Sequence, residues 1–311
     1  MLLNMVKIRY GDAPVFLDVT SVINQYALES LVQVGAGLNT GLTGDNTASI
    51  GATGRYTDRP TITYAPLMGE KFARSLMTPI APATILNLVQ AGYPIDNVFR
   101  IGVQSINGLQ NRYGGQTRAR KADPVFFQLL ETLKRIQNRG AIGLRLEKEN
   151  EKEAALLVFY VKHDEKLEED VMAACEVLGL DPKTTRFRVV YGAMSSNDKE
   201  IAILTRSVLE IIIELSSYIE VPSIHVEENR VSPTFHDEPG ERTSLPPLIR
   251  IRSSPAKPGE AFVSVPYSGY WFWIDERDLP SKRMFSFIMF VFTLTETSGK
   301  GEAPVLTVPT G

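Results

Sequence analysis

The chain has 311 residues and a mass of 34.5 kDa, a length that fits one large domain or two to three small ones. Hydrophobic residues make up 43% and charged residues 22%, which excludes a wholly disordered or fibrous chain. The net charge of −3 argues against a dedicated nucleic-acid-binding protein, which usually carries a strong basic excess. Cys175 is the single cysteine, so an intrachain disulfide and a cysteine-based zinc site are excluded.

The N-terminal segment Met1–Tyr10 does not have the features of a secretory signal, namely a charged leader, a long apolar region and a small-residue cleavage site. We therefore expect either a cytoplasmic protein or the mature form of an exported one. The two most apolar stretches, Leu204–Ile219 and Met284–Leu294, are too short or too interrupted by charge to form spanning helices. The sequence thus predicts no helical membrane insertion.

In chain order, the N-terminal part predicts short helices and strands around a distinct segment. An α+β region at 1–29 and 58–122 ends in a basic loop at 113–122. Pro82 suits a first helical turn, because its missing amide proton is not needed there. The expected elements are a first short helix, a strand at Pro14–Val19, a strand at Thr61–Tyr64, and helices near Gly69–Leu76 and Pro82–Ala91.

The middle region, 123–225, alternates helices and strands. Asp123 and Pro124 predict the cap and first turn of a helix that runs to about Asn138. The elements expected next are a hairpin at 141–161, a helix at Glu165–Leu178 that ends at Gly179, a strand at Arg186–Tyr191 and a helix at Ile203–Ile219.

The last third begins with an irregular Pro-rich excursion at 226–260. An aromatic-rich C-terminal region follows at 261–311. Its expected elements are strands at Phe262–Val265 and Tyr270–Ile274, a helix from Pro280 to about Thr295 and a short strand at Pro304–Val308. The predicted fold class is α+β.

Residues 30–57 form a compositional island in which apolar and polar residues alternate. Gly44-Asp45-Asn46 separates two arms of about eleven residues, and Asp45 carries the single charge between Ser30 and Gly54. Pairing Leu42 with Ala48, and continuing outward, keeps the apolar residues on one face of a hairpin. The apolar positions are Val32, Val34, Ala36, Leu38, Leu42, Ala48, Ile50, Ala52 and Tyr56; the positions on the other face are Gln33, Gly35, Gly37, Asn39, Gly41, Thr47, Ser49, Gly51, Thr53 and Arg55.

This pattern predicts a membrane-inserting hairpin, since a transmembrane β-strand needs about 9–11 residues. The apolar positions would face lipid and the small polar positions would line a water-filled pore. Tyr56 would lie at the membrane interface. A lone hairpin leaves edge amides unpaired in hydrocarbon, so several protomers must close a shared barrel. Eight strands require at least about four protomers.

Two other interpretations of the hairpin stay open: a soluble hairpin packed on the domain core or a partner, and a flexible loop that alternates by accident. Three details favour the pore. An exposed soluble strand normally carries Lys and Glu, which are absent here until Arg55. Glycine disfavours isolated strands, and the apolar face is poor in the Leu, Ile and Phe of ordinary cores.

Catalytic and metal-binding motifs are not found in the sequence. His163, His225 and His236 form no HExxH pattern, and the loop Gly114–Arg118 does not have the Lys-Ser/Thr of a P-loop. Cys175 is interpreted as a buried small residue. The aromatic residues between Tyr267 and Phe292 are more typical of a core or subunit interface than of a stacking platform. We expect no enzymatic activity, cofactor or metal.

Four stretches spread over most of the chain are distinctive as strings: Asn4–Val19, Arg59–Ile80, Phe99–Leu109 and Tyr270–Glu296. They resemble a family of uncharacterised bacterial proteins described as putative outer-membrane lipoproteins. The resemblance brings no activity and no catalytic residues, and it implies export and an upstream lipid-anchored cysteine. By architecture alone, the expected assembly is similar to the curli export channel and other multimeric lipoprotein pores.

The sequence therefore predicts an oligomeric outer-membrane pore or export channel, in which a periplasmic α+β body carries the hairpin. The expected partners are further copies of the chain, membrane lipid and an exported substrate, without nucleic-acid specificity. The alternatives are a monomeric periplasmic binding or adaptor protein and an enzyme of unrecognised type.

Overall fold

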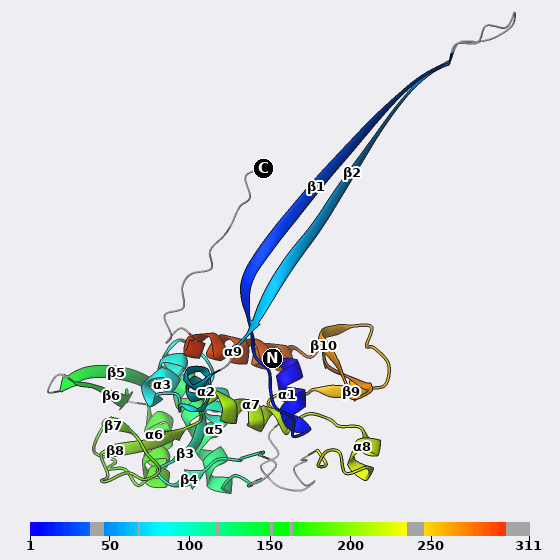
Figure 1. Cartoon of the computed structure of the whole chain (residues 1–311). Helices are drawn as coiled ribbons and strands as arrows, with labels where there is room; N and C mark the ends of the chain where they lie inside the picture. Colours follow the sequence, from blue (N-terminus) through cyan, green and yellow to red (C-terminus); the bar gives the residue numbers. More distant parts are fainter. Residues whose placement is uncertain are drawn as a thin grey trace, which may run out of the picture. The chain divides into compact units, whose positions relative to one another are not determined.

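The computed structural model describes residues 1–37, 47–67, 69–115, 119–149, 152–161, 164–234 and 246–296. The protein is an α+β protein that divides into two units (Figure 1). The first unit contains Met1–Pro14 and the described residues from 69 onward, and the second contains Val15–Leu67. None of the described helices is long and apolar enough to cross a membrane.

A six-stranded mixed sheet organises the first unit, with strand order β4-β3-β8-β7-β6-β5. Strands β7 and β8 are parallel, and all other neighbours are antiparallel. Because β3 pairs with β8, this one sheet takes strands from both sides of the boundary expected at 122/123. The strands are β3 (Val103–Ile106), β4 (Leu109–Gln110), β5 (Ile142–Glu149), β6 (Lys152–Phe159), β7 (Arg186–Tyr191) and β8 (Glu200–Thr205).

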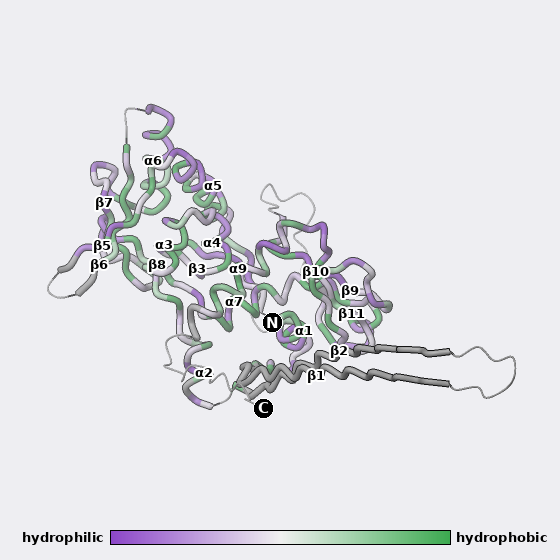
Figure 2. The backbone as a smooth tube through the Cα atoms, turned by 90° about the horizontal axis from the view of Figure 1, so that it is seen from above, coloured by the Kyte–Doolittle hydropathy of each residue, from purple (hydrophilic) through white to green (hydrophobic). Residues whose placement is uncertain are grey.

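Helices pack on this sheet and on one another. Helix α5 contacts both α4 and α6, and α7 contacts α1. Figure 2 shows hydrophobic stretches along α7 and hydrophilic ones along α6, in keeping with the full burial of Ile212 in α7. The helices are α1 (Leu2–Arg9), α2 (Glu70–Met77), α3 (Pro82–Gln90), α4 (Ile95–Gly102), α5 (Pro124–Asn138), α6 (Glu165–Leu178), α7 (Val208–Ser216), α8 (Ser223–Glu227) and α9 (Leu279–Glu296).

Helix ends test the sequence expectations directly. Helix α6 has its predicted bounds, and Gly179 ends it in the left-handed region at φ 65°. Helix α5 also has its predicted bounds, but the Asp123 carboxylate accepts a hydrogen bond from the Gln110 amide at 2.7 Å and does not cap the helix. The helix predicted at Ile203–Ile219 is wrong at its start, because its first residues belong to β8.

A three-stranded antiparallel sheet, ordered β10-β11-β9, completes the first unit. Its strands are β9 (Arg252–Ser254), β10 (Ala261–Tyr267) and β11 (Tyr270–Asp275), and α9 follows. The strands and helix predicted here are confirmed, while the strand expected at Pro304–Val308 lies outside the described residues. The second unit is a two-stranded antiparallel sheet of β1 (Leu17–Gly37) and β2 (Thr47–Pro66).

Candidate functional site

The hairpin formed by β1 and β2 is much longer than the predicted segment 30–57. Its strands have 21 and 20 residues (Figure 1). The separate strands expected at 14–19 and 61–64 are wrong as separate elements, because the second half of the first and all of the second belong to this same hairpin. At about 3.4 Å per residue, a 20-residue strand extends roughly 65 Å, about twice the length that a bilayer core requires.

The register of the hairpin also differs from the predicted one. Ala48 lies opposite Ala36, where the sequence pattern had placed it opposite Leu42. The two registers differ by six residues, because the predicted pairing assumed a turn at Gly44–Asn46, whereas in the structure Gly37 is already paired with Thr47. Since six is an even number, even positions still lie opposite even positions. Residues assigned to one face by parity therefore stay on a common face.

An uncharged stretch occupies the part of the hairpin nearest the connection. It comprises the eight pairs from Ser30–Gly54 to Gly37–Thr47, a length of about 27 Å. The apolar band of an outer-membrane barrel is about 25 Å tall, so the two lengths agree. The next pair places Glu29 directly opposite Arg55, an arrangement of opposite charges that favours this register.

The residues assigned to the two faces are found as follows. Leu38, Asn39, Gly41 and Leu42 lie outside the described residues. The even-numbered positions were assigned to the apolar face. Among them, Val32 lies opposite Ala52, Val34 opposite Ile50, Ala36 opposite Ala48, and Tyr56 opposite Leu28. The odd-numbered positions were assigned to the polar face. Among them, Gln33 lies opposite Gly51, Gly35 opposite Ser49, Gly37 opposite Thr47, and Thr53 opposite Leu31.

Within the described residues, β1 and β2 pair with each other and with no further strand. Each strand therefore presents one outer edge whose amide and carbonyl groups have no ladder partner. An isolated two-stranded hairpin is at best marginally stable in water. The hairpin is thus a structure that gains stability when its edges are paired.

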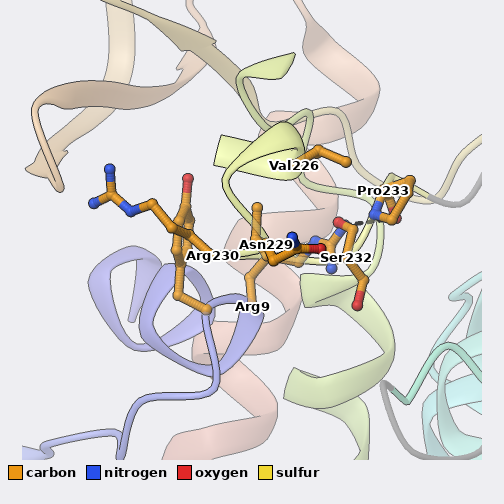
Figure 3. Close-up of a pocket in the computed structure, with 8 residues that line it drawn as sticks. Arg9, Val226, Asn229, Arg230, Ser232 and Pro233 are labelled. Carbon is orange, nitrogen blue, oxygen red and sulfur yellow. Dashed lines mark hydrogen bonds between the residues drawn. The ribbon is translucent and has the colours of Figure 1, made fainter. Parts of the chain in front are cut away.

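A polar pocket of about 460 Å³ lies between the end of α1 and the turn after α8 (Figure 3). Arg9 is 3% exposed, and its Nη2 donates hydrogen bonds to the carbonyl oxygens of Ser232 at 2.7 Å and Pro233 at 2.9 Å. Arg230 also lines the pocket and pairs with Glu228 at 3.3 Å. Arg9 therefore ties the end of α1 to the segment that follows α8.

His225 is buried beside this pocket. The Tyr10 hydroxyl and His225 Nδ1 share a hydrogen bond of 2.7 Å, and the Tyr270 ring meets the imidazole edge-on. Burial lowers the pKa of His225, Arg230 lowers it further, and Glu228 opposes both. Burial raises the pKa of Tyr10 to about 12. Both groups are therefore neutral at pH 7.

Acidification should destabilise the protein through His225. The unfolded chain binds a proton below pH 6.5, whereas the lowered pKa resists protonation in the folded state, so stability present above pH 6.5 is lost as the pH falls. One such proton accounts for at most about 1.4 kcal/mol per pH unit. Urea unfolding between pH 7.5 and 5.5 should show a shallower loss in His225→Gln than in the wild type. An equal slope in both proteins would contradict this role for His225.

A buried ionic cluster joins α7 to the chain that follows β4. Arg112 Nη1 donates to Glu214 Oε1 at 2.7 Å, and Glu214 Oε2 accepts from the Gly114 amide at 2.5 Å. Arg206 is fully buried, with its Nη2 3.9 Å from Glu214 Oε2. Burial lowers the pKa of Arg206, whereas the negative charge of Glu214 raises it. The Arg112 guanidinium also lies 4.3 Å from the centre of the Tyr218 ring. None of these residues was predicted from the sequence as a site residue.

The remaining candidates have structural explanations. Cys175 is buried as predicted, and burial raises the pKa of its thiol to about 11. Tyr113 and Arg120 exchange backbone hydrogen bonds and close the base of the basic loop, whose residues 116–118 lie outside the described part. His163 and His236 lie outside it as well. Among the described residues, no three His, Cys, Asp or Glu side chains gather to hold a metal ion.

The aromatic cluster divides between the core and the two faces of β11. Phe272 is fully buried, whereas its neighbours Trp271 and Trp273 are half-buried on the opposite face. The Lys257 ammonium and the Arg252 guanidinium each lie 5.4 Å from the centre of one of these indoles. The buried part of the cluster, which is core as the composition indicated, includes Met284, Phe285 and Phe292.

Comparisons of the chain with protein-family models, with curated proteins and with solved structures found no match. The hairpin is therefore the feature from which a function can be inferred.

Proposed function

We propose that this protein is the subunit of an oligomeric membrane pore or export channel, to which each copy contributes β1 and β2. The observation that carries the proposal is the Leu17–Pro66 hairpin. Its last eight described pairs carry no charge, and from Val32–Ala52 to Gly37–Thr47 apolar pairs alternate with pairs of polar residues or glycine. Lipid on one side and water on the other account for such alternation in a barrel wall. The proposal assigns no catalytic residue and no cofactor.

The hairpin cannot act alone in a membrane. Each unpaired backbone group in hydrocarbon costs several kcal/mol, so open sheet edges do not occur there. Pairing β1 of one copy with β2 of the next satisfies every edge when a ring closes. With two strands per copy, an eight-stranded barrel needs about four protomers. The hairpin thus requires the homo-oligomer that the sequence analysis expected.

We assign the barrel to the bacterial outer membrane and the α+β unit to the periplasm. Closed barrels of alternating strands are the spanning structures typical of outer membranes. The resemblance of four stretches of the chain to putative outer-membrane lipoproteins supports the same compartment. The strand length supports a barrel that continues beyond the bilayer, because the charged pairs from Glu29–Arg55 onward would lie outside the hydrocarbon.

Charges introduced at the odd-numbered hairpin positions, which are proposed to line the pore, should change its ion selectivity. Ser49→Asp would add one carboxylate per protomer and Ser49→Lys one ammonium, so a ring of like charges would line the pore. We expect reversal potentials in a salt gradient to shift toward cations for Ser49→Asp and toward anions for Ser49→Lys. The measurement uses the full chain, purified in detergent and incorporated into planar bilayers.

The matched control for this test is Gln90→Asp, which places the same charge in helix α3 of the α+β unit. It should leave selectivity as in the wild type. Detergent-purified wild type should also run as a ring-sized oligomer by light scattering. A strict monomer without conductance, or conductance that ignores both Ser49 variants, would contradict the proposed pore.

A further inference from the structure

An apolar groove of about 850 Å³ lies in the α+β unit, between the start of α4, the segment Pro246–Leu248, β10 and α9. This volume is within the range of roughly 300–1,000 Å³ found for small-molecule pockets. Four of the large apolar side chains in the groove remain 38–50% exposed, although most such residues elsewhere in the unit are buried. They are Tyr93, Phe262, Leu279 and Phe290.

The charged residues of the groove are all cations. Arg100, Lys282 and Arg283 line it, and no Asp or Glu is among the described lining residues. Lys282 is compensated by Glu276, with which it forms an ion pair. Arg100 Nη2 donates to the Pro246 carbonyl at 2.8 Å, a neutral acceptor that fixes the guanidinium at the groove. Arg283 is exposed and has no ion-pair partner within the described residues. Within the described part of the chain, the groove therefore combines an apolar wall with two cations, Arg100 and Arg283, that form no ion pair.

We propose that this α4/α9 groove binds a single-chain acyl anion, with the hydrocarbon on the apolar wall and the acidic head group beside Arg100 and Arg283. A purely apolar ligand would not use the cations, and a small hydrophilic anion would leave the apolar wall in water. A cationic amphiphile would be repelled. Charge-assisted hydrogen bonds to a guanidinium are the stronger class of hydrogen bond, and they favour a carboxylate or phosphate head. This inference is independent of the proposed pore.

The test uses the full chain and palmitic acid that carries a photoreactive diazirine in mid-chain. Irradiation should label peptides from α4 and α9. Palmitate should compete with the probe, and the neutral hexadecanol should compete about tenfold less well, as expected if one charged contact contributes about 1.4 kcal/mol. Labelling that does not saturate, or equal competition by the alcohol, would overturn the proposal.

Variants with matched controls separate the two parts of the groove. The double variant Arg100→Gln/Arg283→Gln should lower labelling about tenfold, whereas Arg277→Gln, a similar exposed arginine outside the groove lining, should leave it unchanged. Phe290→Asp should abolish labelling, whereas Met172→Asp on α6 should not. Both apolar positions are exposed, so folding should tolerate either change.

Three further outcomes would also overturn the inference. Labelling that falls equally in Arg277→Gln would show that general positive charge attracts the probe. Capture that occurs only with vesicles of two-chain anionic phospholipid would indicate bilayer contact in place of a single-chain site. Labelling that appears only after removal of residues 297–311 would show that the chain's own C-terminal segment occupies the groove.

Discussion

Ile50→Lys should abolish insertion of the hairpin into a bilayer. Ile50 lies opposite Val34, within the eight uncharged pairs and on the parity proposed to face lipid. A lysine at the midplane of the lipid-facing wall of a barrel costs about 2–4 kcal/mol. Every protomer of the proposed ring would carry the substitution, so the cost would be repeated around the barrel. The measurement is the frequency of channel insertion into planar bilayers at equal protein concentration.

The matched control for Ile50→Lys is the neighbouring substitution Ser49→Lys. Ser49 lies opposite Gly35 on the other parity, so its lysine would enter a water-filled lumen at nearly the same depth. Insertion should therefore continue for Ser49→Lys. If Ile50→Lys inserts as often as the wild type, the even-numbered, apolar face of the hairpin does not face lipid. If both variants fail equally, the two faces of the hairpin do not differ in environment.

The hairpin shows how far an alternating sequence pattern can predict structure. Alternation assigns residues to faces, because side chains of a strand have a period of two. It does not assign partners, because any even shift preserves the faces. The predicted pairing of Leu42 with Ala48 and the observed pairing of Ala36 with Ala48 differ by such a shift. Alternation therefore cannot show that Gly37 lies opposite Thr47, the pairing that distinguishes the observed register from the predicted one.

The apolar run from Ile203 to Ile219 illustrates a second limit. A buried strand and a buried helix cannot be distinguished by apolar periodicity alone. A signal that could have separated β8 from α7 was present, because Ser207 and Glu210 have capping-box spacing. In the structure the Ser207 hydroxyl accepts from the Glu210 amide, while the Glu210 carboxylate accepts from the Ser207 amide. Amphipathic segments with clear end signals, such as α6 with Gly179, were predicted at their bounds.

The buried ionic cluster could not be derived from the sequence. Arg206 interrupts an apolar run, which indicates a charge that needs a partner. Its partner Glu214 is on α7, but Arg112 comes from a segment about a hundred residues earlier in the chain. Only the folded arrangement of β4, β8 and α7 brings the three together. A local sequence pattern does not show which residues that are far apart in the chain lie together in the fold.

Glu214→Ala should lower the free energy of unfolding by about 3–5 kcal/mol, the range found when one partner of a buried ion pair is removed. The substitution leaves the buried guanidinium of Arg206 without the Glu214 carboxylate and removes the ion pair between Glu214 and Arg112. The Gly114 amide also loses its acceptor. Urea unfolding of the full chain, monitored by circular dichroism, measures the change. Glu169→Ala, an exposed position on α6, should stay within about 0.5 kcal/mol of the wild type.

Glu214→Gln separates the charge of this side chain from its hydrogen bonding. Glutamine keeps an oxygen that can accept from the Gly114 amide, but it provides no negative charge for Arg112 and Arg206. If the two buried guanidinium groups cause the loss, Glu214→Gln should be nearly as unstable as Glu214→Ala. If the Gly114 contact causes it, glutamine should restore most of the stability. Two variants that both unfold like the wild type would show that the cluster contributes nothing to holding α7 against the chain after β4.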